Sequence, residues 1–378
     1  MNLKASILLL TTVLGTCATD QKLIRWDNQT KLPANVDGSP HLGLAGPVAG
    51  IIGDRLLIAG GANFPEKMPW DGGTKYYAAQ AYIYQLGDGA LTFLGESELK
   101  EAIAYPGNCS VRQALYVAGG ENQNGAVRSV KKFYIKADML HEESLPDLPV
   151  ALTNGSLVFA SGKLYFVGGE NQQLVSDKIY RLDLSAKNGI WEEVLTLAHP
   201  VSNAVVVSDQ KNKLYIAGGR MRNADNLSTI YDQLFEVDLQ TVSINKIAAL
   251  PQPVAAGTGV WDDNGNILLF GGDHAETFHQ VEGLISRINQ TTDEALKSKL
   301  NEEKAMLQRE HPGFSPDTWS FNVKSKRWKK RNDIVGRSPV TTTALWYQQH
   351  IIIPSGEIRA GVRTDQILVG HTGKNEAL

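Results

Sequence analysis

The chain has 378 residues, with 37 Lys and Arg against 40 Asp and Glu, a formal net charge of −3. That balance argues against non-specific nucleic-acid binding, which needs a clustered basic surface. Thirty-six glycines and only two cysteines exclude a disulfide scaffold and predict many tight turns. Beyond the first twenty residues the apolar runs are too short to cross a bilayer, so we expect no membrane-spanning segment.

Residues 1–18 are predicted to be an export signal. Lys4 gives the positive start, and residues 5–14 form an apolar run of signal-peptide length. The segment Leu14-Gly15-Thr16-Cys17 resembles a bacterial lipobox, which would make Cys17 a lipidated N-terminus. Ordinary cleavage after Ala18 is the alternative. Both alternatives predict an exported, periplasmic protein, either free or as a lipoprotein.

An internal repeat runs through the rest of the chain. An apolar strand pattern ending in Gly-Gly occurs five times, and a sixth copy ends in Ser355-Gly356. The intervals between copies are 59, 49, 50, 53 and 84 residues. The copies begin at Leu56, Leu115, Leu164, Leu214, Ile267 and Ile351.

Each repeat also carries a second half. A strand with an aromatic residue followed by an acid, such as Tyr180 to Asp183, comes before a tryptophan that starts another strand, such as Trp191. Four short strands in about 50 residues are typical of a blade of a kelch-type β-propeller. We therefore predict an all-β fold over residues 20–370, a single six-bladed kelch-type propeller. We expect it to close by pairing an N-terminal strand, at about 23–27, with the C-terminal blade, since closure removes exposed sheet edges.

The longest interval contains an insertion, residues 275–314, of a different kind. Val281, Leu284, Ile285 and Ile288 recur at helical spacing, which predicts a helical insertion in one blade. Because it leaves directly after a Gly-Gly loop, we expect it to lie over the central funnel and to exclude water. A solvated surface decoration is the alternative.

Polar side chains recur after the Gly-Gly pairs and at the starts of the first strands. In a propeller both positions face one end of the ring, so these residues are candidates for binding a polar, hydroxylated ligand such as a sugar. The alternative is that each hydrogen-bonds only to loop backbone. The candidates are Asn63, Asn108, Glu121, Asn154, Glu170, Asn203, Arg220 and Asp273.

The segment Gly356-Glu357-Ile358-Arg359-Ala360-Gly361-Val362-Arg363-Thr364 pairs a carboxylate with an arginine across a glycine turn. Glutamate in a partly dry site can act as a general acid or base. Arginine offers a planar fork that matches a ligand carboxylate. A salt bridge that braces the loop is the alternative.

These residues resemble a known family. The blades, the export signal and the Gly-Glu-x-x-x-Gly-x-Arg-Thr segment are similar to the bacterial N-acetylneuraminate epimerases, the sialic acid mutarotases. In better-known members the segment lies mid-chain, whereas here it lies near the C-terminus. The chain therefore resembles a cyclically permuted branch of the family.

The resemblance implies a mutarotase that interconverts the anomers of N-acetylneuraminate or a related sugar acid, without metal or cofactor. Glu357 takes the position of the family's proton acceptor, and Arg363 that of its active-site arginine. The segment Gly60-Gly61-Ala62-Asn63-Phe64 resembles the family segment Gly-Gly-Ala-Gly-Phe, from which Asn63 departs. Lys75 matches a family lysine. Phe64 and Lys75 thus join the substrate-binding candidates.

Other functions stay open at this point. A non-catalytic glycan-binding propeller of a sugar-uptake system shares the funnel and the arginine but needs no proton-transfer group. A sialidase would carry an arginine triad and repeated Asp-box motifs. A copper oxidase would need a Cys–Tyr pair and further histidine ligands beside His274 and His279. The sequence assigns no oligomeric state.

Overall fold

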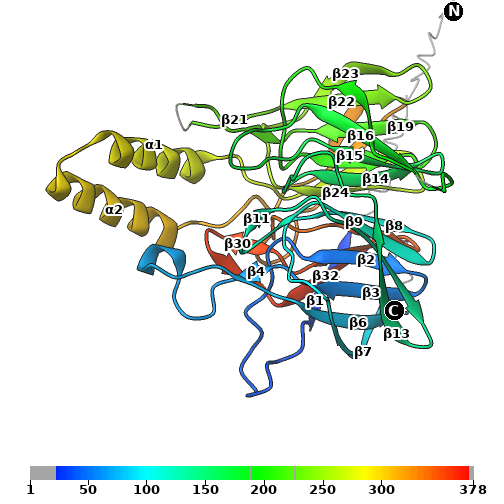
Figure 1. Ribbon diagram of the computed structural model, residues 1–378, viewed down its shortest axis with the longest axis horizontal. Helices are drawn as coiled ribbons and strands as arrows, with labels where there is room; N and C mark the ends of the chain where they lie inside the picture. The colour runs from blue at the N-terminus through cyan, green and yellow to red at the C-terminus, as the bar shows by residue number, and fades with distance from the viewer. Residues whose placement is uncertain (1–22, 88, 188, 225–226, 374–378) are drawn as a thin grey trace, which may run out of the picture.

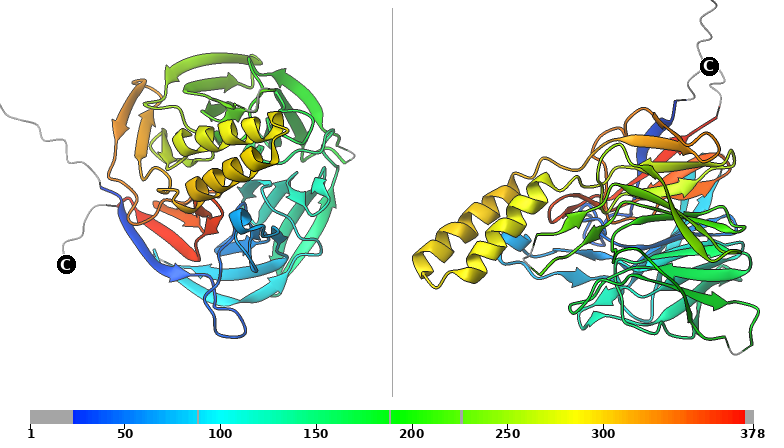
Figure 2. Two further views of the ribbon diagram at one scale, coloured as in Figure 1. Left: turned by 90° about the vertical axis from the view of Figure 1, so that its left-hand side faces the viewer. Right: turned by 90° about the horizontal axis from the view of Figure 1, so that it is seen from above.

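The computed structural model describes residues 23–87, 89–187, 189–224 and 227–373. Residues 1–18, predicted to be an export signal, and Cys17 lie outside this part of the chain. Within it, six four-stranded antiparallel sheets are arranged around a central axis (Figures 1 and 2). The predicted six-bladed kelch-type propeller is thus confirmed.

The blades are numbered 1 to 6 by the chain order of their innermost strands. The innermost strands are β2 (Val48–Ile52), β8 (Gly107–Val111), β14 (Ser156–Ala160), β18 (Val205–Ser208), β24 (Thr258–Trp261) and β28 (Leu345–Tyr347). The second strands are β3 (Arg55–Ala59), β9 (Ala114–Ala118), β15 (Lys163–Val167), β19 (Lys213–Ala217), β25 (Asn266–Phe270) and β29 (His350–Pro354).

The two outer positions of each blade are more exposed. The third strands are β6 (Gln80–Leu86), β12 (Val130–Lys136), β16 (Lys178–Asp183), β22 (Gln233–Asp238), β26 (Thr318–Asn322) and β32 (Gln366–His371). The fourth are β7 (Leu91–Glu98), β13 (Met139–Leu145), β17 (Glu192–Thr196), β23 (Ser243–Ala249), β27 (Arg327–Lys330) and, in blade 6, β1 (Arg25–Lys31). The second strands are almost wholly buried, which explains their continuous apolar runs.

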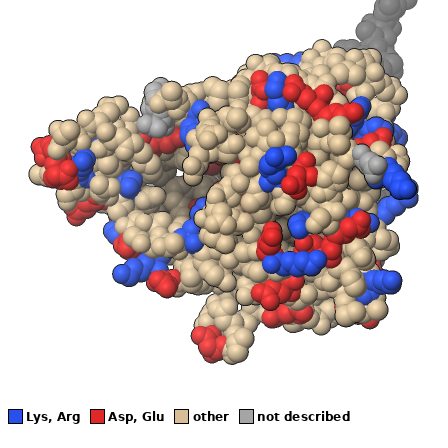
Figure 3. Space-filling view, viewed as in Figure 1, with Lys and Arg blue, Asp and Glu red and all other residues tan. Residues whose placement is uncertain are grey.

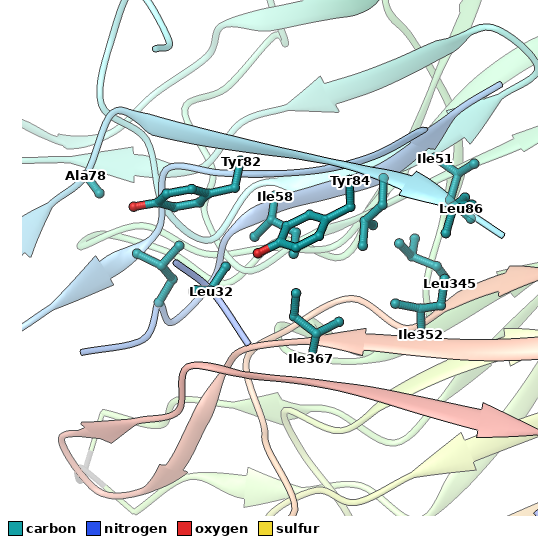
Figure 4. Packing of buried hydrophobic residues seen from close by; sticks show 12 residues of the cluster. Leu32, Ile51, Ile58, Ala78, Tyr82, Tyr84, Leu86, Leu345, Ile352 and Ile367 are labelled. Atoms are coloured by element: carbon teal, nitrogen blue, oxygen red, sulfur yellow. The ribbon is translucent and has the colours of Figure 1, made fainter. Parts of the chain in front are cut away.

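Blade 6 joins the two ends of the chain. β1 pairs antiparallel with β32, so the N-terminal strand supplies the outer edge of a sheet whose other strands come from the C-terminus. The hydroxyl of Tyr84 in blade 1 donates to the carbonyl of Lys31 at 2.9 Å. Figure 4 shows the packing between blades 1 and 6, where Tyr84 lies near Ile367 and Leu32. This closure leaves no half-finished blade at the seam.

The loops between second and third strands all lie on one face of the ring, shown on the left in Figure 1. Four of them form two-stranded ribbons, and the loop of blade 1 also holds the short 3-10 helix η1 (Pro69–Asp71). The ribbons are β4 (Ala62–Asn63) with β5 (Tyr76–Tyr77), β10 (Glu121–Asn122) with β11 (Gly125–Ala126), β20 (Arg220–Met221) with β21 (Thr229–Ile230), and β30 (Glu357–Arg359) with β31 (Val362–Arg363).

The corresponding loop of blade 5 holds a helical hairpin, α1 (Glu276–Gln290) and α2 (Glu294–Arg309). The hairpin crosses the central axis when the ring is viewed end-on, and its far end projects away from the propeller (Figure 2). The Asp293 side chain accepts from the Ala295 and Leu296 N–H groups and so caps α2. Neither helix of the described ranges is long and apolar enough to cross a membrane.

The Gly-Gly pairs connect neighbouring blades. The Gly169 N–H donates to the carbonyl of Val201, which precedes the innermost strand of the next blade, at 2.9 Å. Gly168 and Gly169 both have positive φ, and a side chain on Gly168 would overlap the same carbonyl oxygen. In blade 6 the first glycine is replaced by Ser355, whose buried hydroxyl lies within hydrogen-bond distance of the Leu44 and Thr364 carbonyls.

Six residues, one before each innermost strand, form a closed ring of backbone hydrogen bonds around the axis. Each has positive φ, and each N–H donates to the carbonyl of its counterpart in the preceding blade over 2.6–3.1 Å. We call these residues the axial ring: Gly46, Tyr105, Asn154, Asn203, Ala256 and Thr341. Positive φ is uncommon outside glycine and is found at ligand sites. The ring forms the floor beneath the helical hairpin.

Candidate active site

A cavity of about 340 Å³ lies between the axial ring and the base of the helical hairpin. That volume is typical of a site for a small molecule. In the space-filling view the surface is hollowed where the hairpin meets the propeller (Figure 3). The polar side chains that line the cavity are those of Tyr105, Asn154, Asn203, Arg220, Asp273, Thr277, Gln308, His311, Thr341 and Glu357.

Glu357 and Arg363 are brought together by the β30–β31 ribbon, in which they lie directly opposite each other. Opposed residues of a ribbon place their side chains on one face, and here Oε2 of Glu357 is 3.6 Å from Nη2 of Arg363. The turn between them contains Gly361, which has positive φ and packs so closely on Pro69 that a side chain would collide with it. The Gly361 N–H donates to Oε1 of Glu357 at 2.8 Å.

The two partners differ in access to the cavity. The Glu357 side chain lines the cavity and is 18% exposed, whereas that of Arg363 is 4% exposed and does not line it. The Arg363 guanidinium lies 4.8 Å from the centre of the Phe64 ring, and its Nε–H donates to the Ala62 carbonyl at 3.2 Å. Arg363 therefore sits behind Glu357 and holds it in place.

A second pair is formed by Glu170 and Arg220, which follow the second strands of blades 3 and 4. Arg220 Nη2 is 2.7 Å from Oε1 of Glu170, and the same oxygen accepts from the amides of Asn154 and Asn203. Glu170 is buried and does not line the cavity, whereas Arg220 lines it and lies 5.4 Å from the Phe278 ring. Here the arginine is accessible and the carboxylate is enclosed.

A third group surrounds Lys75. Its Nζ is 3.0 Å from Oε1 of Glu121, and that oxygen also accepts from the Tyr77 hydroxyl. The same Nζ lies 5.0 Å from the centre of the Tyr105 ring. Burial raises the pKa of Tyr105, although Lys75 and Arg363 oppose that shift, so the hydroxyl stays protonated and can donate. Neither Lys75 nor Glu121 lines the cavity; they support its wall next to Tyr105.

The structure thus separates the residues that the sequence grouped together. Five of them line the cavity: Asn154, Asn203, Arg220, Asp273 and Glu357. Six others lie behind its wall, at Asn63, Phe64, Lys75, Glu121, Glu170 and Arg363. Asn63 is buried and donates to the Gly43 carbonyl, which makes it a loop-bracing residue.

Asn108 lies elsewhere. It does not line the cavity beneath the hairpin, and the axial-ring position of blade 2 is held by Tyr105, three residues earlier. Asn108 belongs to β8 and lines, together with Asn154 and Asn203, a second channel of about 130 Å³ along the axis, where it donates to the Pro47 carbonyl and the Thr343 hydroxyl.

The insertion contributes cavity residues that sequence reasoning missed, namely Phe278 of α1 and, after α2, His311 and Phe314. The Asp273 carboxylate accepts from the Ala275 N–H at 2.7 Å and fixes the turn into α1. Glu282 of α1 accepts from both the backbone N–H and the hydroxyl of Ser228, and that hydroxyl accepts from Arg220. The only signal for these residues was that the insertion begins next to the funnel. In the described ranges, no three His, Cys, Asp or Glu side chains form a group that could hold a metal ion.

Comparison with known proteins places the chain in a family. The family model of N-acetylneuraminate epimerase matches residues 145–378, a range that includes the Glu357 and Arg363 ribbon. The N-acetylneuraminate epimerase of Salmonella typhi is 22% identical over 226 residues, which cover 59% of this chain and 57% of that protein. That of Vibrio vulnificus is 23% identical over 229 residues and 58% of its length.

The chain thus spans less than two thirds of the length of the curated relatives it matches. A solved structure titled "Structure of YjhT" superimposes with a TM-score of 0.63 and 15% identity, covering 89% of this chain and 96% of that one. At that identity the superposition shows the fold alone. Because the family model matches well over half of the residues, the chain belongs to the N-acetylneuraminate epimerase family.

Proposed function

We propose that the protein is a mutarotase that interconverts the anomers of N-acetylneuraminate or a related sugar acid. The family match supports an epimerase, and the curated relatives carry that name. The observation that carries the proposal is Glu357, whose carboxylate faces the cavity while Gly361 and Arg363 hold it from behind.

The chemistry asked of Glu357 is proton transfer in both directions. The carboxylate removes the proton of the anomeric hydroxyl, the bond between the anomeric carbon and the ring oxygen breaks, and the ring oxygen receives a proton. The open form then holds a ketone and a hydroxyl, and closure on the other face of the ketone reverses each step. One carboxylate with a water or a second polar group suffices, and such a group contributes about 10²–10⁴-fold.

We assign binding of the substrate carboxylate to Arg220. It lines the cavity, and its guanidinium is oriented by Glu170 and the Ser228 hydroxyl. A planar guanidinium suits a carboxylate. The sequence analysis assigned that role to Arg363, whose direct contact with the substrate remains a prediction: its side chain is 4% exposed and does not line the cavity. In the present geometry Arg363 serves as a positioning residue for Glu357.

One-dimensional proton NMR of freshly dissolved N-acetylneuraminate tests the function. We expect the anomer signals to equilibrate faster with the protein than without it, and the Glu357→Gln variant to lose this acceleration while still binding the sugar. Line broadening without acceleration in the unaltered protein would instead support the glycan-binding propeller. If the protein caused neither acceleration nor line broadening, this sugar would be excluded as the substrate.

Two further points remain proposals. We infer a cyclically permuted order of blades, supported by the Glu357 segment near the C-terminus and by sequence matches that cover only part of each relative, whereas the fold covers 96% of YjhT. Export, with or without lipid at Cys17, rests on residues 1–18 alone. N-terminal sequencing and mass measurement of the processed protein decide between the two cleavage alternatives.

A further inference from the structure

His311 is a cavity residue without a role in the mechanism given above. It follows α2, where the chain returns from the helical hairpin to blade 5, and it lines the same cavity as Glu357 and Asp273. The residue is 9% exposed, and its ring centre lies 4.9 Å from that of Phe314. The side chain is therefore fixed by packing at the cavity wall rather than extended into solvent.

The two ring nitrogens of His311 are not equivalent. The Gly313 N–H donates to Nδ1 at 3.0 Å, and Gly313 has the positive φ that this tight turn needs. A nitrogen that accepts a hydrogen bond carries no proton, so the neutral ring holds its proton on Nε2. Nε2 makes no hydrogen bond in the described part of the chain and is not enclosed by it. It is available to a ligand as a donor.

The surroundings of His311 keep the ring neutral. Burial lowers its pKa below the ordinary 6.5, and Arg359 lowers it further, although the carboxylates of Asp273 and Glu357 act in the opposite direction. Protonation would also place a second N–H at Nδ1, against the Gly313 N–H that now donates to it. At neutral pH the imidazole is therefore uncharged and has one N–H to offer.

We propose that His311 donates this hydrogen bond from Nε2 to the ring oxygen of the substrate as the bond to the anomeric carbon breaks. The electron pair of that bond moves to the ring oxygen, which becomes negatively charged until it is protonated. A neutral imidazole holds its own proton firmly, so it stabilises the charge without being consumed. Glu357 supplies the proton that it took from the anomeric hydroxyl. The inference rests on the proposed mutarotase function and assigns its second polar group.

The matched variants are His311→Gln, which keeps a neutral N–H at a similar reach, and His311→Phe, which keeps an aromatic ring but has no donor. Loss of one donor to a developing oxyanion typically lowers kcat by about 10²–10³-fold. We expect such a loss for His311→Phe and a loss below about tenfold for His311→Gln. Equal rates for His311→Phe and the unaltered protein would overturn the proposal.

The pH profile separates a neutral donor from a protonated general acid. Protonation sets an N–H at Nδ1 against the Gly313 N–H and so disturbs the position of the ring. A neutral donor therefore predicts a rate that falls when the pH drops through the pKa of His311. The His311→Gln variant should not show this fall. A protonated acid predicts a rate that falls as the pH rises, with His311→Gln as slow as His311→Phe. That second pattern would contradict the inference.

Failure of the mutarotase proposal itself is recognised separately. The ¹⁵N resonance of Nε2, assigned by its absence in His311→Gln, is followed while the protein is titrated with N-acetylneuraminate. We expect a shift on saturation that is also present in Glu357→Gln, since it reports binding rather than turnover. The absence of a shift would refute the contact between Nε2 and the sugar. A shift without any acceleration would support that contact but refute the mutarotase function. Thermal unfolding of each variant shows that it is folded.

Discussion

The two carboxylate–arginine pairs of the site are built in opposite ways. In the pair of Glu357 and Arg363 the carboxylate lines the cavity and the arginine is buried behind it. In the pair of Glu170 and Arg220 the arginine lines the cavity, and the carboxylate is buried under three donors on one oxygen. Each pair therefore presents one member to a ligand.

This difference shows why the presence of an acid beside an arginine does not identify a general base. Glu170 spends one oxygen on two amides and a guanidinium, which leaves it orienting its neighbours. Glu357 accepts one backbone N–H, and its contact with Arg363 is long, at 3.6 Å. Glu357 lines the cavity, so it is the carboxylate that can take a substrate proton, while Arg220 is the cation that can hold a substrate carboxylate.

The largest effect is expected from Glu357→Gln. The amide preserves size and can still accept from Gly361, but it cannot take up a proton, so kcat should fall by about 10²–10⁴-fold. Anomer equilibration measured by NMR gives the rate, and thermal unfolding gives the stability, which should be nearly unchanged.

The matched control is Glu170→Gln, which removes the same charge from the other pair. Because Glu170 does not reach the cavity, kcat should stay within about tenfold while KM changes through Arg220. If the two variants lost kcat equally, the distinction between an accessible and an enclosed carboxylate would be wrong.

Arg220→Leu is expected to act on stability as well as binding. Removing Arg220 leaves an uncompensated charge on the buried Glu170, and because Arg220 itself is partly exposed the cost should lie below the figure of about 3–5 kcal/mol for a fully buried ion pair. KM for N-acetylneuraminate should rise because the substrate carboxylate loses its guanidinium. Urea unfolding measures the first effect, and titration of binding measures the second.

The double variant Glu170→Gln/Arg220→Leu sharpens this prediction. It removes the stranded charge, so the free energy of unfolding should recover in part while KM stays high. If KM also returned toward its original value, Arg220 would support the fold without binding the substrate carboxylate.

Much of this architecture was readable from the sequence because its signals are local. The Gly-Gly pairs mark a position where two residues with positive φ meet a carbonyl of the next blade, as at Gly168 and Gly169, and only glycine fits there readily. The Glu357 and Arg363 pair was equally local, since Arg363 follows Glu357 by six positions across a glycine turn and the two lie in one ribbon.

What the sequence did not show depends on contacts between distant segments. The axial ring is defined by backbone conformation, so its six members share no side-chain type, and Tyr105 was passed over for Asn108. The sequence also did not show that Arg363 is shielded from the cavity, because the Phe64 ring that packs on its guanidinium comes from another blade. His311 is distant from Glu357 in the sequence, and only the path of the chain through the hairpin brings both residues to the same cavity.

A smaller effect is expected from Arg363→Lys. Lysine keeps the positive charge but cannot donate to the Ala62 carbonyl and approach Glu357 with the same planar group. Glu357 should therefore lose some of its alignment, and kcat should fall by up to about 10²-fold with little change in KM. A rise in KM with kcat unchanged would instead show that Arg363 itself meets the substrate carboxylate.

The smallest effect is expected where the helical hairpin reaches the second pair. Glu282 accepts two hydrogen bonds from Ser228, whose hydroxyl in turn accepts from Arg220 at 3.3 Å. Glu282→Gln leaves one acceptor oxygen in place of two, a loss of about 0.5–1.5 kcal/mol. Because the change reaches the substrate only through the orientation of Arg220, KM should rise by a few-fold at most and kcat should not change. The matched control is Glu303→Gln on the exposed surface of α2, which should change neither constant. Equal behaviour of the two variants would mean that the hairpin covers the cavity without orienting Arg220, whereas a fall in kcat for Glu282→Gln would place the effect of the hairpin on Glu357 instead.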